Sequence, residues 1–164
     1  MKFNDTLKLI FSLLVCQLAG VVGSIFTLKS ISTWYPTLIK PFLNPPNWLF
    51  GPVWTTLYIL MGIACFIIWK KYSYVQEISE QKIIKNGMIL FDIQLVLNAL
   101  WPVVFFGAQN LGVSLIEILV LFTFVVLTTV KFFKISKVAG WLLVPYVLWT
   151  GFAIYLNYSI WILN

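Results

Sequence analysis

Apolar residues are grouped into five long runs that are separated by shorter polar segments. The runs cover residues 7–28, 50–69, 83–106, 111–133 and 138–163. A membrane-spanning helix needs about 20 predominantly apolar residues, because it rises ~1.5 Å per residue through a hydrocarbon core of roughly 30 Å. The pattern therefore predicts an all-α integral membrane protein, in which residues 1–164 form a single domain, a bundle of five transmembrane helices. The first run is longer than a signal-peptide core and no clear cleavage site follows it, so we expect it to be retained.

The segment at residues 34–58 follows the first run and reaches into the second, and it has an unusual composition. It contains five of the seven prolines and three of the eight tryptophans. Each proline lacks a backbone donor and biases the preceding residue toward extended geometry, so the first half of this segment can be neither helix nor strand. Aromatic side chains on a stiff loop are unfavourable in water, and they should pack onto the bundle. We therefore expect an extramembrane loop that acts as a lid.

The eleven lysines are divided unequally between the two sides of a five-helix bundle. One side carries Lys2, Lys8, Lys70, Lys71, Lys82, Lys85, Lys131, Lys134 and Lys137, and the other carries Lys29 and Lys40. Lysine-rich loops tend to stay in the cytoplasm. The sequence thus predicts a cytoplasmic N-terminus and a proline-rich loop on the outer face, with a bacterial cell membrane as the default host.

Composition narrows the classes of function. Hydrophobic residues make up 61% of the chain and charged residues only 10%, which is too little polar surface for a soluble globule of this length. The net charge of +6 comes from lysines that lie between the apolar runs rather than in one patch, so we expect no nucleic-acid partner. The chain has no histidine, which removes the commonest metal ligand and general base. We expect no metal site and no bound cofactor.

Small residues recur every four positions along the first predicted helix. Ser12, Cys16, Gly20 and Ser24 share one face, and small residues at this spacing let two helix backbones approach closely in lipid. The partner can be another helix of the same monomer or the same helix of a second copy. The pattern leaves both readings open.

The third and fourth predicted helices contain polar groups at membrane depth. Pro102 removes the helical hydrogen bond to the carbonyl of Asn98, so the backbone oxygen and the side chain of Asn98 are both expected to be free, either for a ligand or for tying helices together. Asp92 and Glu117 are costly in a bilayer and often functional. They cannot pair with each other, because both are acidic. Each needs its own donor or is protonated.

Unusual polar and aromatic residues fall at one depth when the five helices are placed in a bilayer. These residues are Tyr35, Trp48, Trp54, Tyr58, Asn98, Trp101, Trp149, Ala153 and Asn157. The simplest account is an aromatic cavity that opens outward under the loop, which is the usual composition of a ligand pocket. Flat apolar rings would stack on the indoles, and anionic edge groups could meet Lys29 or Lys40. Porphyrins and planar drugs fit this description, and without histidine a metal-free tetrapyrrole fits better than haem. The alternative is that the tryptophans serve only packing and the interfacial belt.

The sequence resembles the TspO/MBR family, which comprises tryptophan-rich sensory proteins and translocator proteins. The resemblance covers nearly the whole chain. It is carried by Trp34-Tyr35, Leu38, Lys40-Pro41, Pro45-Pro46, Trp48, Phe50, Pro52-Val53-Trp54, Leu57-Tyr58, Leu97-Asn98, Trp101-Pro102, Phe105-Phe106, Pro145-Tyr146, Trp149, Phe152-Ala153 and Leu156-Asn157.

The resemblance implies a membrane receptor or translocator, commonly a homodimer, that binds porphyrins and isoquinoline or benzodiazepine-type ligands beneath the first loop. Carried over by position, the ligand-binding residues are Tyr35, Trp48, Trp54, Asn98, Trp101, Trp149 and Ala153. Animal relatives have a basic residue after a tyrosine in the fifth helix as a proposed sterol contact. Neither Tyr155 nor Tyr158 is followed by one here, which argues against sterol recognition through that element.

Two classes of function follow from this resemblance. The first is binding and signalling or transport of a porphyrin-like ligand. The second is an enzyme: in some bacterial relatives the tryptophans that match Trp54 and Trp149 are linked to light-driven breakdown of protoporphyrin, and these two would then be the catalytic residues. The sequence supplies no acid, base or metal site of an ordinary kind, so we favour binding over turnover.

Overall fold

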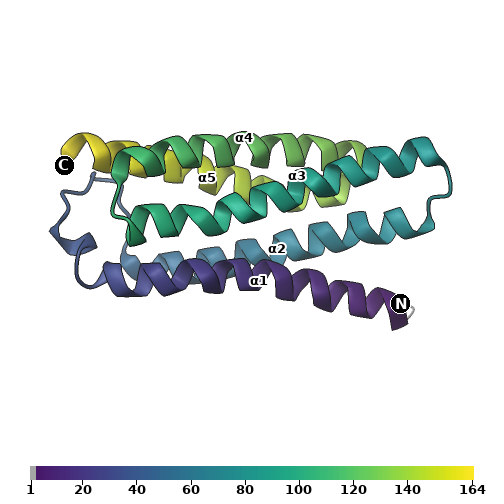
Figure 1. Cartoon of the computed structure of the whole chain (residues 1–164), viewed down its shortest axis with the longest axis horizontal. Helices are drawn as coiled ribbons and strands as arrows, with labels where there is room; N and C mark the ends of the chain where they lie inside the picture. Colours follow the sequence, from purple (N-terminus) through teal and green to yellow (C-terminus); the bar gives the residue numbers. More distant parts are fainter. Residues whose placement is uncertain (1–2) are drawn as a thin grey trace.

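The computed structural model describes residues 3–164, and five long helices dominate it (Figure 1). They are α1 (Phe3–Ile31), α2 (Asn47–Tyr74), α3 (Ile78–Pro102), α4 (Leu111–Ile135) and α5 (Lys137–Leu163). A short 3-10 helix, η1 (Tyr35–Thr37), lies in the first loop, and a π-helix, η2 (Val103–Gly107), follows α3. No strand occurs within residues 3–164.

All five helices are long and apolar enough to cross a membrane, which confirms the predicted five-helix fold. Each predicted apolar run lies within one helix, or within α3 and the π-helix that follows it. The helices continue beyond the runs: the second predicted span ends at residue 69 and α2 ends at Tyr74, because polar residues can extend a helix past the hydrocarbon. Side chains cap two of the junctions. Asn110 accepts a hydrogen bond from the N–H of Val113 in α4, and Ser136 accepts one from the N–H of Ala139 in α5.

Neighbouring helices in the sequence are also neighbours in space. The main packing pairs are α1 with α2, α3 with α4, and α4 with α5, while α2 also packs on α5 and α1 on α3. The described start of α1 and the end of α5 lie at opposite ends of the bundle (Figure 1). The first loop and the end of α5 share one end, which we call the loop end.

The core is tightly packed at the end of the bundle away from the first loop. Met61, Ile68, Phe132 and Ala139 are fully buried there, and Phe91 stacks on Phe132 with ring centroids 5.7 Å apart. A second, smaller cluster of buried apolar side chains lies beneath the loop: Tyr35, Phe105, Phe106 and Ile160. Between these two regions the bundle is hollow.

The small residues of α1 pack against helices of the same chain. Ser12 and Cys16 are buried. A Cβ atom on Gly20 would lie 2.5 Å from the ring of Tyr58, and one on Gly23 would lie 2.9 Å from the ring of Pro102. These positions let α1 approach α2 and α3 closely, as the intramolecular reading of the four-residue spacing predicts.

Candidate ligand-binding cavity

The π-helix η2 directs two phenylalanines beneath the first loop. Pro102 ends α3, and in the wider turn that follows, the N–H of Ala108 donates to the carbonyl of Val103 at 2.8 Å. Phe105 and Phe106 are both buried. They form a floor for Tyr35 of the loop, whose ring centroid lies 5.7 Å from that of Phe106. π-Turns of this kind occur often at functional sites.

A cavity of about 480 Å³ lies between α1, α2, α3, α5 and the first loop. All seven residues that the resemblance implies for ligand binding line its wall. They are Tyr35, Trp48, Trp54, Asn98, Trp101, Trp149 and Ala153. The structure thus brings together residues that are spread over more than a hundred positions of the sequence. That they bind a ligand stays a prediction.

The aromatic wall residues are held by ring contacts. Trp54 stacks on Tyr58, with centroids 5.6 Å apart, and presents an edge to Tyr146. Trp101 stacks on Phe105 at 4.9 Å, and Trp149 meets Phe50 edge to face at 6.1 Å. Trp48 differs from the others because 70% of its surface is exposed, so it lies at the rim.

Asn98 is the centre of a buried hydrogen-bond chain. Tyr58 donates its hydroxyl proton to Oδ1 of Asn98 at 2.5 Å, and Nδ2 of Asn98 donates to the hydroxyl of Tyr146 at 2.8 Å. Tyr146 in turn donates to Oε1 of Gln94 at 2.9 Å. Of the two alternatives for the Asn98 side chain, these bonds agree with tying helices together, and contact with a ligand stays a prediction. The side chain ties α2, α3 and α5 together while it borders the cavity, because a paired amide in the bilayer avoids the cost of an unpaired one.

A second polar pair joins α3 to α5 and α4. The indole N–H of Trp101 donates to Oδ1 of Asn157 at 3.1 Å, and Nδ2 of Asn157 donates to the carbonyl of Leu111 at 3.0 Å. The indole N–H groups of Trp54 and Trp149 have no hydrogen-bond partner within residues 3–164. Both residues line the cavity.

The family model of the TspO/MBR family matches residues 12–162. The chain belongs to the TspO/MBR family. It is 45% identical over 154 residues to the tryptophan-rich protein TspO of Chlorobaculum tepidum, which covers 92% of this chain and 91% of the relative. It is 43% identical over 160 residues to the TspO of Archaeoglobus fulgidus, covering 98% and 99%. It is 38% identical over 145 residues to the translocator protein of Homo sapiens, covering 88% and 83%.

One wall of this TspO/MBR cavity was missed by reasoning from the sequence. Helix α1 contributes Gln17, Gly20, Ser24 and Thr27. The small residues among them were assigned to helix packing alone. They allow close packing and also leave room for the cavity. Their position at the same depth as the tryptophans could have indicated this from the sequence.

The loop carries one of the two cations expected near the ligand. Nζ of Lys40 lies 4.7 Å from the ring centroid of Tyr35, whose hydroxyl donates to Oδ1 of Asn44 at 2.8 Å. Burial raises the pKa of the Tyr35 phenol above its ordinary value, so this hydroxyl stays a neutral donor. Lys29 is in the last turn of α1. Neither lysine is part of the cavity wall.

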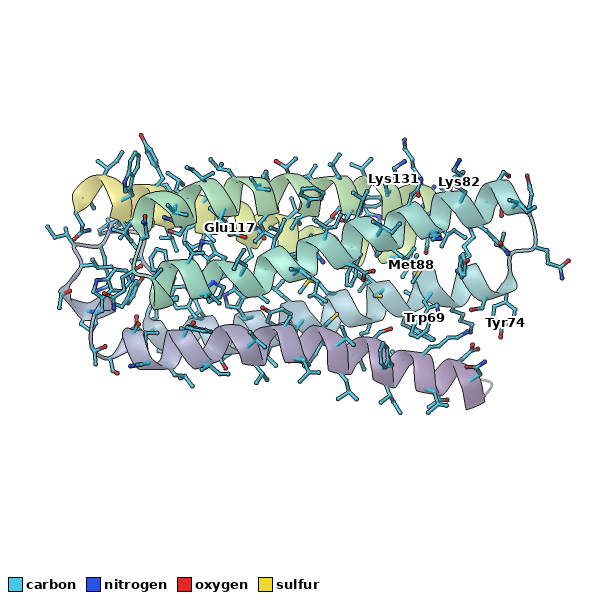
Figure 2. All side chains as sticks on the ribbon, in the orientation of Figure 1. Trp69, Tyr74, Lys82, Met88, Glu117 and Lys131 are labelled. Carbon is cyan, nitrogen blue, oxygen red and sulfur yellow. The ribbon has the colours of Figure 1, made fainter. Side chains whose placement is uncertain are left out.

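The two intramembrane acids lie outside the cavity wall. Asp92 is exposed on α3. Glu117 extends from the half of α4 nearer the loop end (Figure 2), and both of its carboxyl oxygens are buried without a hydrogen-bond partner. Neither acid forms an ion pair within residues 3–164. Neither residue therefore contributes to the chemistry of the cavity directly.

Proposed function

We propose that the protein is a membrane receptor or translocator that binds porphyrins such as protoporphyrin IX, and related planar apolar ligands, in this cavity. The observation that carries the proposal is the convergence of Trp54, Trp101 and Trp149 on one hollow of about 480 Å³. That volume lies within the roughly 300–1,000 Å³ of ordinary ligand pockets. Several relatives are named translocator proteins or tryptophan-rich sensory proteins, which agrees with ligand recognition in a membrane.

The chemistry of the wall supports a flat, largely uncharged ligand. Indole faces favour stacking with planar rings. The amides of Asn98 and Asn157 are already engaged in hydrogen bonds with the protein. The unpaired indole donors of Trp54 and Trp149 would suit one or two acceptor atoms on the ligand, and Lys40 would suit an anionic edge group beneath the loop.

Titration of the purified protein with protoporphyrin IX in the dark tests this function. Binding should quench tryptophan fluorescence in a saturable manner. Ala153→Phe fills the cavity and Trp149→Leu removes a stacking face, so each should weaken binding at least tenfold. Trp141→Leu is the matched control: it removes an exposed tryptophan of α5 that is not part of the wall and should leave affinity unchanged. Equal affinities for all four proteins would contradict the proposal.

Light separates binding from the enzymatic alternative. Trp54 and Trp149 share the cavity wall, as the photochemical function requires. If illuminated protein converts protoporphyrin IX to a defined product, and Trp54→Phe and Trp149→Phe each abolish the conversion while the pigment still binds, the protein is an enzyme. Pigment that stays intact under light supports the receptor.

We also propose a cytoplasmic N-terminus and assembly as a homodimer. Lys82 and Lys131 lie at the end of the bundle opposite the loop end (Figure 2), as the unequal lysine distribution predicts. Lys2, which was counted on that side, lies outside the described residues. A bacterial cell membrane remains the expected host.

A further inference from the structure

The exposed part of the cavity wall belongs to only two of the helices around it. Among the wall residues, those of α3, η2 and α5 are buried or half-buried. The exposed ones are Val21 and Leu28 of α1 and Asn47, Trp48, Gly51 and Thr55 of α2. The cavity therefore meets the surroundings of the protein between α1 and α2.

We call this side of the cavity the α1–α2 slot. It is bordered by Gln17, Val21, Ser24 and Leu28 on one side and by Trp48, Gly51 and Thr55 on the other. A Cβ atom on Gly51 would have no neighbouring heavy atom within 4 Å. From Asn47 to Thr55 the slot extends about 12 Å along α2, at ~1.5 Å per residue.

The lower end of the slot is closed by direct contacts between α1 and α2. Nε2 of Gln17 donates to the carbonyl of Thr55 at 3.3 Å. The ring of Tyr58 lies against Gly20, and further from the loop Gly62 lies against Leu13. The slot is thus restricted to the half of the bilayer next to the first loop.

The route through the loop is blocked by hydrogen bonds. The N–H of Ile39 donates to Oδ1 of Asn164 at 2.9 Å, and Nδ2 of Asn164 donates back to the carbonyl of Ile39 at 3.0 Å. At the base of the loop, the hydroxyl of Ser30 donates to the carbonyl of Phe106 at 2.6 Å. The loop is therefore fastened to the end of α5 and α1 is fastened to η2, so a ligand using this route would have to break the bonds between Ile39 and Asn164.

The slot is compatible with lipid although it contains hydroxyl groups. Ser24 donates to the carbonyl of Val21 at 2.7 Å, and Thr55 donates to the carbonyl of Gly51 at 2.9 Å. Because these hydroxyls are satisfied within their own helices, they need no water. Val21 and Leu28 are more than half exposed, as lipid-facing residues would be.

We propose that the ligand enters and leaves the cavity sideways, through the α1–α2 slot, from the half of the bilayer next to the first loop. This inference rests on the proposed function, since it concerns the ligand of the same cavity. It limits the ligand class to planar amphiphiles that dissolve in the bilayer before they bind, with the apolar ring leading and any charged edge remaining near the loop.

Rates of protoporphyrin IX binding test the route. The full chain is reconstituted in phospholipid nanodiscs, and tryptophan quenching is followed after rapid mixing in the dark. Gly51→Phe fits the empty space at the slot and should lower the association and dissociation rates together, each at least tenfold. A lost contact within the site would raise the dissociation rate instead.

Two control variants test the competing routes. Thr56→Phe places the same ring five residues further along α2, in a groove between α2 and α5 that is also lined by Pro145 and Trp149. Asn164→Ala releases the loop. Both should leave the rates within twofold. Faster binding in Asn164→Ala, or slower binding in Thr56→Phe with no effect of Gly51→Phe, would overturn the slot as the route.

A measurement without ligand keeps the two proposals distinguishable. If the unaltered protein shows no saturable quenching, the proposed function fails. The slot is then judged by a spin label on Gly51→Cys, in a chain whose Cys16 and Cys65 are changed to alanine. Relaxation should be enhanced more by oxygen, which concentrates in lipid, than by a water-soluble nickel chelate. Stronger enhancement by the chelate would place the slot in water and overturn lateral access.

Discussion

Asn98 illustrates how a residue can border a cavity and still be fully engaged by the protein. Its amide accepts from one phenol and donates to another, and those phenols belong to helices 40 and 48 positions away along the chain. The sequence placed Asn98 at the correct depth, because depth depends only on position along a helix. It could not identify the partners, because they depend on how three helices face one another.

The Asn98 chain should contribute strongly to stability. Asn98→Leu would leave the hydroxyls of Tyr58 and Tyr146 buried without this partner, and we expect a loss of about 2–4 kcal/mol. Thermal unfolding in detergent measures the effect as a lower midpoint. Val96→Ala, at an exposed position of the same helix, is the control and should change the midpoint little. Equal midpoints for the two variants would show that the chain is not formed.

Glu117 is a residue whose polar atoms lack partners, and its replacement should therefore be tolerated. A buried carboxylate without a hydrogen bond is unfavourable in a bilayer. Glu117→Gln keeps the size and removes the charge, so we expect an unchanged or higher unfolding midpoint at neutral pH. The exposed Glu80→Gln serves as the comparison. A fall of several degrees for Glu117→Gln alone would mean that the carboxylate is paired in the membrane.

At the scale of elements, α1 is both a packing partner and a cavity wall. The space beside Gly20 of α1 is occupied by the ring of Tyr58, whereas the space beside Gly51 of α2 is open. The four-residue spacing of small residues predicts close packing without naming the partner. The structure assigns that packing to α2 and α3 of the same chain.

A matched pair of alanine substitutions measures this difference. Gly20→Ala forces a methyl group against Tyr58 and should destabilise the protein by about 1–3 kcal/mol, the usual penalty of overpacking. Gly51→Ala meets no neighbour and should stabilise by about 0.5–1 kcal/mol, because alanine is the better helix former. Unfolding midpoints of the two variants check both signs. The same sign for both would contradict the close approach of α1 to Tyr58.

The first loop is fixed by the end of α5 through Asn164. Asn164→Ala removes two hydrogen bonds to Ile39, and amide hydrogen exchange in residues 32–46 should accelerate while exchange in the helices stays unchanged. Ile162→Ala, at a nearby exposed position, is the control. Unchanged loop exchange in Asn164→Ala would show that aromatic packing alone holds the loop.

At the scale of the whole molecule, hydropathy predicts the number and order of the helices, because the requirement for about 20 apolar residues is severe. It predicts helix ends less well, since polar residues such as Lys70 and Lys71 continue α2. The cavity was found by comparing depths. The side on which the cavity opens could not be predicted, because the depth of a residue does not show which two helices border the opening.

Orientation in the membrane can be predicted from the lysines and tested by labelling. In whole cells, a membrane-impermeant maleimide should react with Asn44→Cys in the first loop and not with Glu80→Cys at the other end, in a chain that lacks Cys16 and Cys65. The reverse pattern would place the N-terminus outside.

The buried hydroxyl and amide groups of the cavity wall are paired before any guest arrives. Tyr58, Asn98, Trp101 and Asn157 all bond to protein atoms, so a guest gains little by offering them new partners. The choice among guests would then depend on the thickness and the outline of the guest molecule. A macrocycle puckered by a few tenths of an ångström should be rejected more strongly than a flat one that carries different edge substituents.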